Sequence, residues 1–347
     1  MAYTDIDNPL DYFNTVLYTG NNTSQSITGV GFKPDWVWCK SRNDGNNHNV
    51  FDSVRGVTKW IETDNQNAEQ TASNTLTSFN SDGFSVGDHG EINGGNDTQV
   101  SWCWLTGTSF TNDASGTSIG SIDSAGSASD ASGFSIVSYT GTGSAGTIKH
   151  GLSSAPKMII AKDRASGSLS WFVGHASLGF TKRLKLDGNN DAADNTVWNN
   201  TNPTSSVFSV GSSANANTSG NAIIAYCFAE KQGYSKFGSY IGNGNADGTF
   251  VYLGFSPAFV MVKNTSAAEN WIIFDNKRPG RNLTDALLKP NLNNVESTSG
   301  VKFDLLSNGF KARVSDAEGN SSGHTFIYMA FASNPFVTSK GVPATAR

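Results

Sequence analysis

The sequence has no long apolar run, little charge and few segments that favour a helix. No apolar stretch reaches the ~18 residues that a membrane span requires, and the N-terminal residues lack the basic and apolar regions of a secretion signal. We therefore expect a protein that is made in the cytoplasm and does not insert into a membrane.

Charge of one sign is also scarce. Charged residues make up 15% of the chain, the formal net charge is −5, and the two signs are scattered along the sequence. No basic stripe is available to neutralise a phosphate backbone, so nucleic acid is not an expected partner.

Cysteine is rare, and its positions exclude a disulfide framework. The three cysteines, Cys39, Cys103 and Cys227, are odd in number and lie in apolar, aromatic segments. Their spacings of 64 and 124 residues do not fit the close pairs of a zinc site. We expect all three thiols to be small core residues.

Glycine, aromatic residues and small polar residues are abundant. The chain has 37 Gly and 11% aromatic residues, with many Ser, Thr and Asn. This composition is typical of short strands joined by tight turns, and it predicts an all-β protein. The best helix candidate is a single short segment, Leu283–Lys289.

An internal repeat organises the chain. Three landmarks recur in order: a Tyr before a Gly turn, a Pro that opens a strand ending in Lys, and a Phe followed about 20 residues later by an aromatic residue. The Tyr-to-Pro spacings are 16, 17 and 17, and the Pro-to-Phe spacings are 50, 52 and 53. The landmarks are Tyr18, Pro34, Lys40, Phe84 and Trp104; Tyr139, Pro156, Lys162, Phe208 and Phe228; and Tyr240, Pro257, Lys263, Phe310 and Phe331.

These spacings predict three tandem antiparallel β-sandwich or jelly-roll-like modules. The first two Pro landmarks are 122 residues apart and the last two are 101 apart, so the first interval is 21 residues longer. The additional residues fall in a Gly/Ser/Ala-rich segment that we expect to be a flexible linker or an exposed loop. The expected organisation is an N-terminal arm (1–13), module 1 (14–105), the linker (106–132), module 2 (133–235), module 3 (236–336) and a C-terminal tail (337–347).

Two glycine motifs resemble catalytic or cofactor loops. Residues 141–146 match GxGxxG, but a strand-like segment follows where a dinucleotide site needs a helix, so we interpret them as a hairpin turn. Residues 116–120 match GxSxG inside the expected linker, away from the strand and helix that a nucleophile elbow requires. We therefore expect no catalytic residues, no cofactor and a non-enzymatic protein.

Carboxylates and histidines are the remaining candidates for chemistry. Asp52 and Arg55 match Asp275 and Arg278 in the third copy, and we favour a local ion pair over a catalytic dyad at both places. The five histidines are far apart, so we assign no metal site to them. The acidic loops that begin at Asp187 and Asn245 lack a regular calcium-loop spacing, and the sequence leaves Ca²⁺ binding there as an open alternative.

Exposed aromatic rings can stack on sugars, and the tryptophans are candidates for that role. Trp36, Trp38, Trp171 and Trp271 lie within strand patterns and are expected in the core. Trp60 and Trp198 lie among polar residues and are the candidate glycan- or receptor-binding residues.

The repeated segments resemble a known family. They include "YFNTVLYTGNNTSQSITGVGFKPDWVW", "FDSVRG", "SFNSDGFSVG", "AYCFAEKQGYSKFGSYIGNG" and "FASNPFVTS", and they are similar to a repeated domain of marine bacteriophage virion proteins, which are tail-fibre-like or structural. The resemblance covers almost the whole chain and supplies no catalytic residues.

The resemblance implies a virion protein, in contact with other virion proteins and with a host surface glycan or receptor. A tail fibre or appendage that contributes to host attachment is the leading interpretation. A capsid-decoration or tail-assembly protein and a surface-polysaccharide depolymerase are the alternatives. Phage fibres are commonly homotrimers, whereas three tandem modules can supply threefold pseudosymmetry within one chain.

Overall fold

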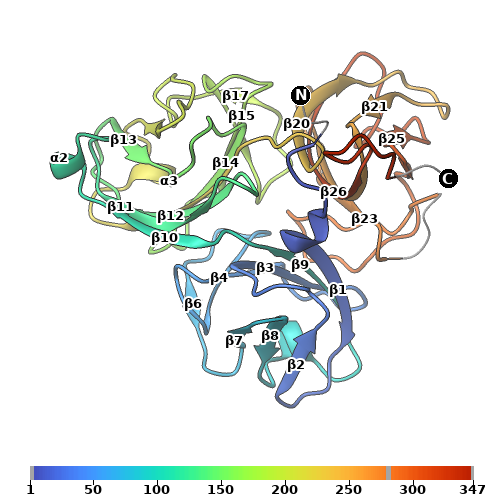
Figure 1. The fold of residues 1–347 in the computed structure, drawn as a ribbon, viewed down its shortest axis with the longest axis horizontal. Coiled ribbons are helices and arrows are strands. Elements are labelled where there is room, and N and C mark those ends of the chain that lie inside the picture. The colour runs from blue at the N-terminus through green and yellow to red at the C-terminus, as the bar shows by residue number, and fades with distance from the viewer. Residues whose placement is uncertain (1–3, 279–282, 345–347) are drawn as a thin grey trace.

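The computed structural model describes residues 4–278 and 283–344. Strands dominate these residues, which confirms the all-β class, and every pairing between named strands is antiparallel. Figure 1 shows three lobes around a common centre, one for each repeat. Each lobe is a sandwich of a large sheet and a small sheet.

Module 1 has a six-stranded large sheet, in the order β1-β9-β3-β4-β5-β6, and a small sheet, β2-β8-β7. Its elements are η1 (Pro9–Asp11), β1 (Phe13–Thr19), β2 (Gln25–Thr28), β3 (Trp36–Ser41), β4 (Asn49–Asp52), β5 (Lys59–Glu62), β6 (Gln70–Thr71), β7 (Leu76–Asn80), β8 (Gly83–Val86), α1 (Gly90–Asn93) and β9 (Thr98–Trp104).

Module 2 has an eight-stranded large sheet, β10-β11-β12-β19-β14-β15-β16-β17, and a small sheet of β13 and β18. Its elements are β10 (Thr108–Asn112), α2 (Ala114–Thr117), β11 (Ser124–Ser129), β12 (Phe134–Thr140), β13 (Gly146–Lys149), β14 (Met158–Asp163), β15 (Phe172–His175), β16 (Lys182–Lys185), β17 (Ala193–Asp194), β18 (Val207–Val210), α3 (Ala214–Asn217) and β19 (Ala222–Phe228).

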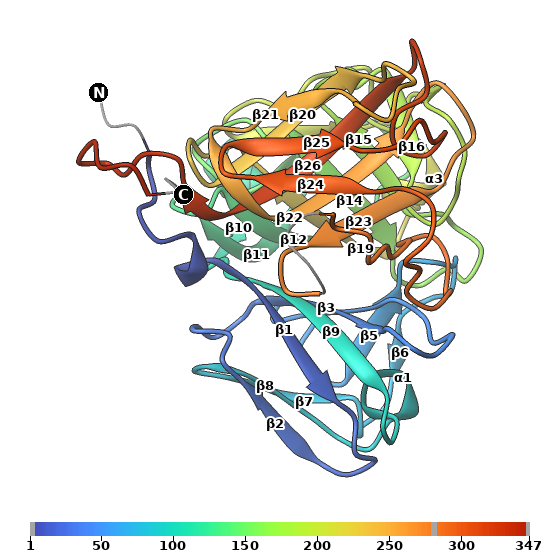
Figure 2. The same ribbon diagram turned by 90° about the vertical axis from the view of Figure 1, so that its right-hand side faces the viewer.

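Module 3 has a four-stranded large sheet, β20-β26-β22-β23, and a small sheet, β21-β25-β24. In Figure 2 its strands cross above module 1. Its elements are β20 (Ser235–Ile241), β21 (Phe250–Tyr252), β22 (Phe255–Asn264), β23 (Trp271–Asp275), β24 (Phe303–Leu306), β25 (Gly309–Ala312) and β26 (Thr325–Pro335).

The strand registers make the three modules comparable residue by residue. At the same place in each large sheet, Trp36 pairs with Trp104, Met158 with Phe228, and Phe259 with Phe331. β1, β12 and β20 are therefore equivalent strands, because each pairs with the strand that carries the last aromatic landmark.

The central strands of each large sheet are buried on both faces. One face packs against the small sheet of its own module, which gives each module a core of its own. The other face joins a single aromatic core shared by all three modules, in which the Trp36 ring lies 4.8 Å from Tyr226 and the Phe13 ring lies 5.3 Å from Phe331. The shared core explains why the strands read as continuous apolar runs rather than as alternating patterns.

The structure corrects the expected linker. Residues 106–132 contain β10 and β11, which extend the large sheet of module 2 beyond β12. Small side chains make this possible, since a side chain at Gly126 would collide with the carbonyl oxygen of Ile136. The backbone hydrogen bonds of the sheet hold a segment that is too poor in apolar residues to form a core by itself.

The expected helix at Leu283–Lys289 is also wrong. Thr284, Leu287 and Leu288 form isolated β-bridges instead. Leu287 and Leu288 pack in the cores beside neighbouring strands, and this tertiary contact overrides a weak local helix preference.

The two terminal segments contact each other. The Ser339 N–H and hydroxyl each donate to the Asp7 carboxylate at 2.6 Å, and Ile6 is buried in the shared core. The expected arm and tail are thus ordered where they are described; residues 1–3 and 345–347 of those two predictions lie outside the described residues.

Candidate binding surface

The paired Asp and Arg form a network at the contact between modules 1 and 2. The Arg55 guanidinium donates to both the Asp52 carboxylate and the carboxylate of Glu69, and the Tyr226 hydroxyl donates to Asp52 Oδ2 at 2.8 Å. Arg164 of module 2 completes the network with a bidentate contact to Glu69. The Asp52 and Arg55 side chains are fully buried.

The contact between modules 3 and 1 repeats this network. Arg278 donates to Asp275 and Glu296, Trp102 Nε1 donates to Asp275 Oδ2 at 2.9 Å, and Arg42 makes a bidentate contact to Glu296. Burial by itself raises the pKa of Asp275, but the Arg278 charge and the hydrogen bonds from Arg278 and Trp102 outweigh it and lower that pKa.

The contact between modules 2 and 3 replaces every member of the network. His175 takes the place of the Asp, and its ring Nε2 lies 3.2 Å from the Tyr328 carbonyl oxygen. The Ser177 N–H donates to Nδ1, which places the ring proton on Nε2. The remaining positions, identified by the same strand registers and backbone hydrogen bonds, are Leu178 for Arg, Ala192 for Glu, Thr265 for Arg and Met329 for Tyr or Trp.

One physical reason connects these exchanges. A Met side chain has no hydrogen-bond donor, so an ionised Asp beside Met329 would be buried without the partner that Tyr226 or Trp102 supplies. A neutral His, which bonds to a backbone carbonyl, avoids that cost. The prediction of local ion pairs is confirmed, and the pairs prove to be parts of module-to-module contacts.

Two of the three Lys landmarks also link neighbouring modules, whereas Lys40 donates to carbonyls of its own module. Lys162 Nζ donates to Gln66 O of module 1, and Lys263 Nζ donates to Asn189 O of module 2, each at 3.1 Å. Both ammonium groups also donate to carbonyls of their own modules. Burial lowers the pKa of Lys40, Lys162 and Lys263 to about 8.

The two candidate tryptophans are not surface residues. Trp60 is 5% exposed and packs against His89, and Trp198 is fully buried against Phe180. Neither ring offers a face to a sugar, so the prediction of glycan binding at these positions is corrected. Long-range packing covers both rings, and the polar residues beside them in sequence give no sign of it.

The other candidates lie in the core or apart from one another. All three thiols are free and buried, as expected, and burial raises the pKa of Cys39 to about 12. No group of three His, Cys, Asp or Glu within residues 4–278 and 283–344 could hold a metal ion. No helix in that part of the chain is long and apolar enough to cross a membrane.

The loops that follow the Tyr landmarks are exposed and firmly held. The hydroxyls of Tyr18, Tyr139 and Tyr240 each donate to a backbone carbonyl just before a buried Asn. The side-chain oxygen of that Asn accepts a hydrogen bond from a backbone N–H of the loop, and its NH₂ group donates to a loop carbonyl. Asn217, for example, accepts from the Thr142 N–H and donates to the Ser144 carbonyl oxygen. The loops are 20–24, 141–145 and 242–248, held by Asn93, Asn217 and Asn320.

The GxGxxG match is one of these loops. It runs from β12 into β13, so a strand follows it, as the hairpin interpretation requires. Gly141 is needed because a side chain there would lie about 2.2 Å from the Thr218 carbonyl oxygen. The GxSxG match lies on α2 and the turn after it, where Ser118 is exposed.

A groove lies beside β20 and β21 in module 3. It encloses about 550 Å³ between Lys236, Tyr252, Phe336 and Glu230. Tyr252, which lines the groove, is 52% exposed, and Phe250 on the same strand is 43% exposed; Ile241, at the other end of β20, is 53% exposed. Sequence reasoning missed these residues, although Phe250 and Tyr252 are aromatic where the equivalent strand of module 1 has Ser26 and Thr28.

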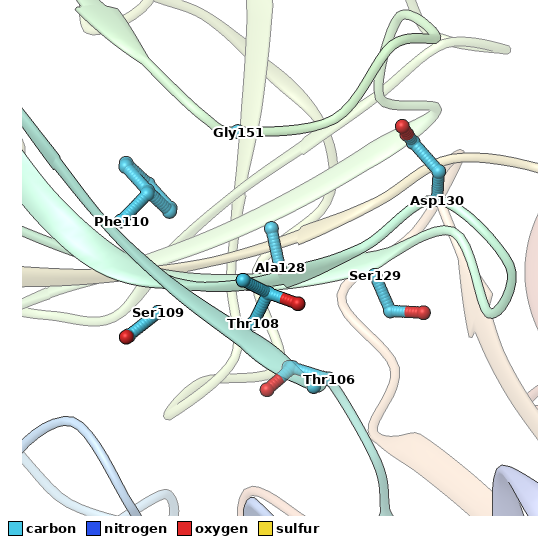
Figure 3. Close-up of a pocket in the computed structure, with 9 residues that line it drawn as sticks. Thr106, Thr108, Ser109, Phe110, Ala128, Ser129, Asp130 and Gly151 are labelled. Carbon is cyan, nitrogen blue, oxygen red and sulfur yellow. The ribbon is translucent and has the colours of Figure 1, made fainter.

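A second hollow lies beside the inserted strands (Figure 3). Figure 3 shows Phe110, Thr108 and Asp130 around it, with Gly151 on the opposite side. Its volume is about 350 Å³, and its lining consists mainly of hydroxyl groups and backbone. Asp130 is the single carboxylate in the lining, so the hollow has no acid–base pair.

Comparison with known proteins gives a family without an activity. The model of the family described as "Domain of unknown function (DUF7483)" matches residues 8–335. No curated protein matches the sequence.

Proposed function

The chain belongs to the DUF7483 family, whose description assigns no activity, and we propose that this chain is a non-enzymatic structural protein of a bacteriophage virion. We place it in a tail fibre or another appendage that contributes to host attachment. Its partners are then other virion proteins and a glycan or receptor on the host surface. The resemblance of the repeated segments to virion proteins motivates the proposal.

One structural observation carries the non-enzymatic part of the proposal. The acidic and basic residues that recur between copies are buried in module-to-module contacts, where Asp52 and Asp275 accept hydrogen bonds from neighbouring modules. A glycosidase needs two carboxyl groups that can reach the same glycosidic bond. These two carboxylates are fully buried and cannot reach a substrate.

The exposed loops support a role in attachment. Loops 20–24, 141–145 and 242–248 differ in sequence while Asn93, Asn217 and Asn320 hold them in the same way. Loops held in place by a rigid scaffold lose little conformational entropy on binding, which favours recognition. The three modules also supply a threefold arrangement within one chain, which favours one chain per position on the particle over a homotrimer.

Location on the particle tests the proposal. Purified particles are labelled with an antibody against the chain and imaged, and the purified protein is added to host cells to compete with particle adsorption. Label on an appendage together with reduced adsorption is the expected result. Label on the capsid lattice would show a decoration protein, and absence from particles would refute a virion role. In a separate assay the protein is incubated with host envelope glycans, and the release of new reducing ends would show a depolymerase. The mass of the purified protein distinguishes one chain from three.

A further inference from the structure

Module 2 shows how this sandwich is closed at one side. β11 pairs with the outer edge of β12 from Ser124 to Ser129, and the residues just before it cover the small sheet as well. The N–H groups of Ser121 and Ile122 both donate to the Thr147 carbonyl on β13. A single inserted segment therefore covers the edges of both sheets of module 2.

The equivalent edges of module 3 have no such segment. β20 and β21 occupy the places of β12 and β13, and within the part of the chain that the structure describes no strand pairs with the outer edge of either. Only the first residue of β20 is occupied there, because Lys231 forms a single bridge with Ser235 and its carbonyl oxygen accepts the Ser235 N–H. The outward N–H of Phe237, which is equivalent to Ile136, donates to the Glu230 carboxylate at 3.2 Å. That carboxylate occupies the place where an added strand would present a carbonyl oxygen.

The side chains along this edge differ from those of the other modules. Ile241, Phe250 and Tyr252 are large, apolar and exposed, whereas the equivalent positions are Thr140, Thr147 and Lys149 in module 2 and Thr19, Ser26 and Thr28 in module 1. A long apolar edge is an aggregation hazard that proteins usually blunt with polar residues. At these three positions module 1 has polar residues and module 3 has apolar ones, although Ser239 of β20 is polar where β1 has the exposed Leu17.

Charge at the edge indicates what the partner carries. Lys236 Nζ donates to the Tyr252 carbonyl oxygen and lies 5.4 Å from the centre of the Tyr252 ring. No carboxylate of the described residues lies within ion-pair distance of it. An added strand that places an acidic residue beside Lys236 would supply that partner.

We propose that the open edge of module 3, formed by β20 from Phe237 onward and by β21, binds an extended segment of a partner protein. This segment displaces the Glu230 carboxylate from the Phe237 N–H and pairs antiparallel to β20 as Ser124–Ser127 of β11 pairs with β12. The segment carries an apolar residue that packs on Phe250 and Tyr252, and an acidic residue for Lys236. Backbone hydrogen bonds supply affinity, and the side-chain contacts supply specificity. This inference is independent of the virion proposal.

The chain's own segment provides the probe. A labelled peptide of residues 121–130 contains Ile122 and Asp130, and in the register of β11 it would place Ala128 opposite Lys236. Fluorescence anisotropy with the full-length chain is expected to show saturable binding, at least tenfold weaker after Ser239→Pro. Proline removes an outward N–H, and an edge strand tolerates it. The matched control is Leu17→Pro at the equivalent position of β1, which is expected to leave binding unchanged.

A second variant separates binding from folding. Replacing Ile241, Phe250 and Tyr252 by the Thr, Ser and Thr of module 1 is expected to weaken binding at least tenfold with no loss of thermal stability. Replacing Ala128 of the peptide by Asp places a carboxylate opposite Lys236 and is expected to strengthen binding. The proposal would be overturned if binding is not saturable, or if Leu17→Pro weakens binding as much as Ser239→Pro does. It would also be overturned if the chain self-associates and Ser239→Pro abolishes that self-association, because a second copy would then occupy the edge.

Discussion

The hydroxyl of Tyr226 in module 2 donates to the carboxylate of Asp52 in module 1 across 174 residues of sequence. The same positions in the next pair of modules hold Trp102 and Asp275, bonded in the same way. Two different donors, a phenol and an indole, therefore satisfy equivalent buried carboxylates. The bond is a property of the module contact rather than of a particular residue type.

Replacing Tyr226 by Phe is expected to lower the free energy of unfolding by about 1–3 kcal/mol, because Asp52 Oδ2 stays buried and loses one donor. Urea denaturation measures the change. Tyr234→Phe is the matched control, since Tyr234 is fully buried and its hydroxyl has no hydrogen-bond partner among the described residues. Equal losses in the two variants would show that the Tyr226 hydrogen bond does not stabilise the contact.

The Arg55→Leu variant is expected to lose about 3–5 kcal/mol, because the fully buried Asp52 would lose its cation, whereas Glu69 keeps Arg164. Copying the whole contact between modules 2 and 3 should recover most of that loss, since it removes the buried charges together. Unfolding curves compare the single variant with the fivefold one. If the fivefold variant is no more stable than Arg55→Leu, the five exchanges are not coupled. The fivefold variant is Asp52→His, Arg55→Leu, Glu69→Ala, Arg164→Thr and Tyr226→Met.

Acid is expected to weaken the contact that His175 makes. Burial lowers the pKa of His175 from 6.5 to about 4, so the folded protein favours the neutral ring. This contribution to stability is complete above pH 6.5 and is lost as the pH falls toward 4, by about 3 kcal/mol in total. The unfolding free energies of the wild type and of His175→Gln are measured from pH 7 to pH 4. The difference between them should shrink by about 3 kcal/mol as the pH falls from 6.5 to 4. Parallel curves for the two proteins would contradict the assignment.

The glycine after each Tyr landmark is expected to be essential for stability. An alanine at position 141 would bring its methyl group against the backbone of Thr218 and Asn217, at a cost of about 1–3 kcal/mol. Gly90→Ala is the control, because no heavy atom lies within 4 Å of the added carbon. Thermal unfolding of both variants tests the difference, and a stable Gly141→Ala protein would show that this loop can shift.

The sequence predicts the modules well because the landmarks have local causes. Tyr18 recurs because its hydroxyl donates to the carbonyl oxygen of Ile92. Gly20 recurs because a side chain at that position would collide with the backbone of Gly94. Lys40 recurs because its ammonium group is surrounded by carbonyls. Such requirements fix both residue type and spacing, so comparing the copies reveals them.

The contacts between modules depend on residues that are distant in sequence, and here prediction from pattern fails. Nothing near Trp198 shows that Phe180 covers it, and nothing near Ser124 shows that it pairs with Tyr139. One signal was present: the Asp and Arg of copies one and three are missing from copy two. The loss of the Asp and Arg from copy two accompanies a second exchange, because the module that packs there has Met329 where the other two modules have Tyr226 and Trp102.

The shared aromatic core has a consequence for synthesis on the ribosome. Phe13 and Trp104 of module 1 pack against Phe331, which lies 227 residues after Trp104. At about 5–20 residues per second, roughly 10–45 s pass before that partner is made. Throughout this interval the first module exposes a face of aromatic rings, so a cell that makes this protein has to keep that face from associating with other nascent chains.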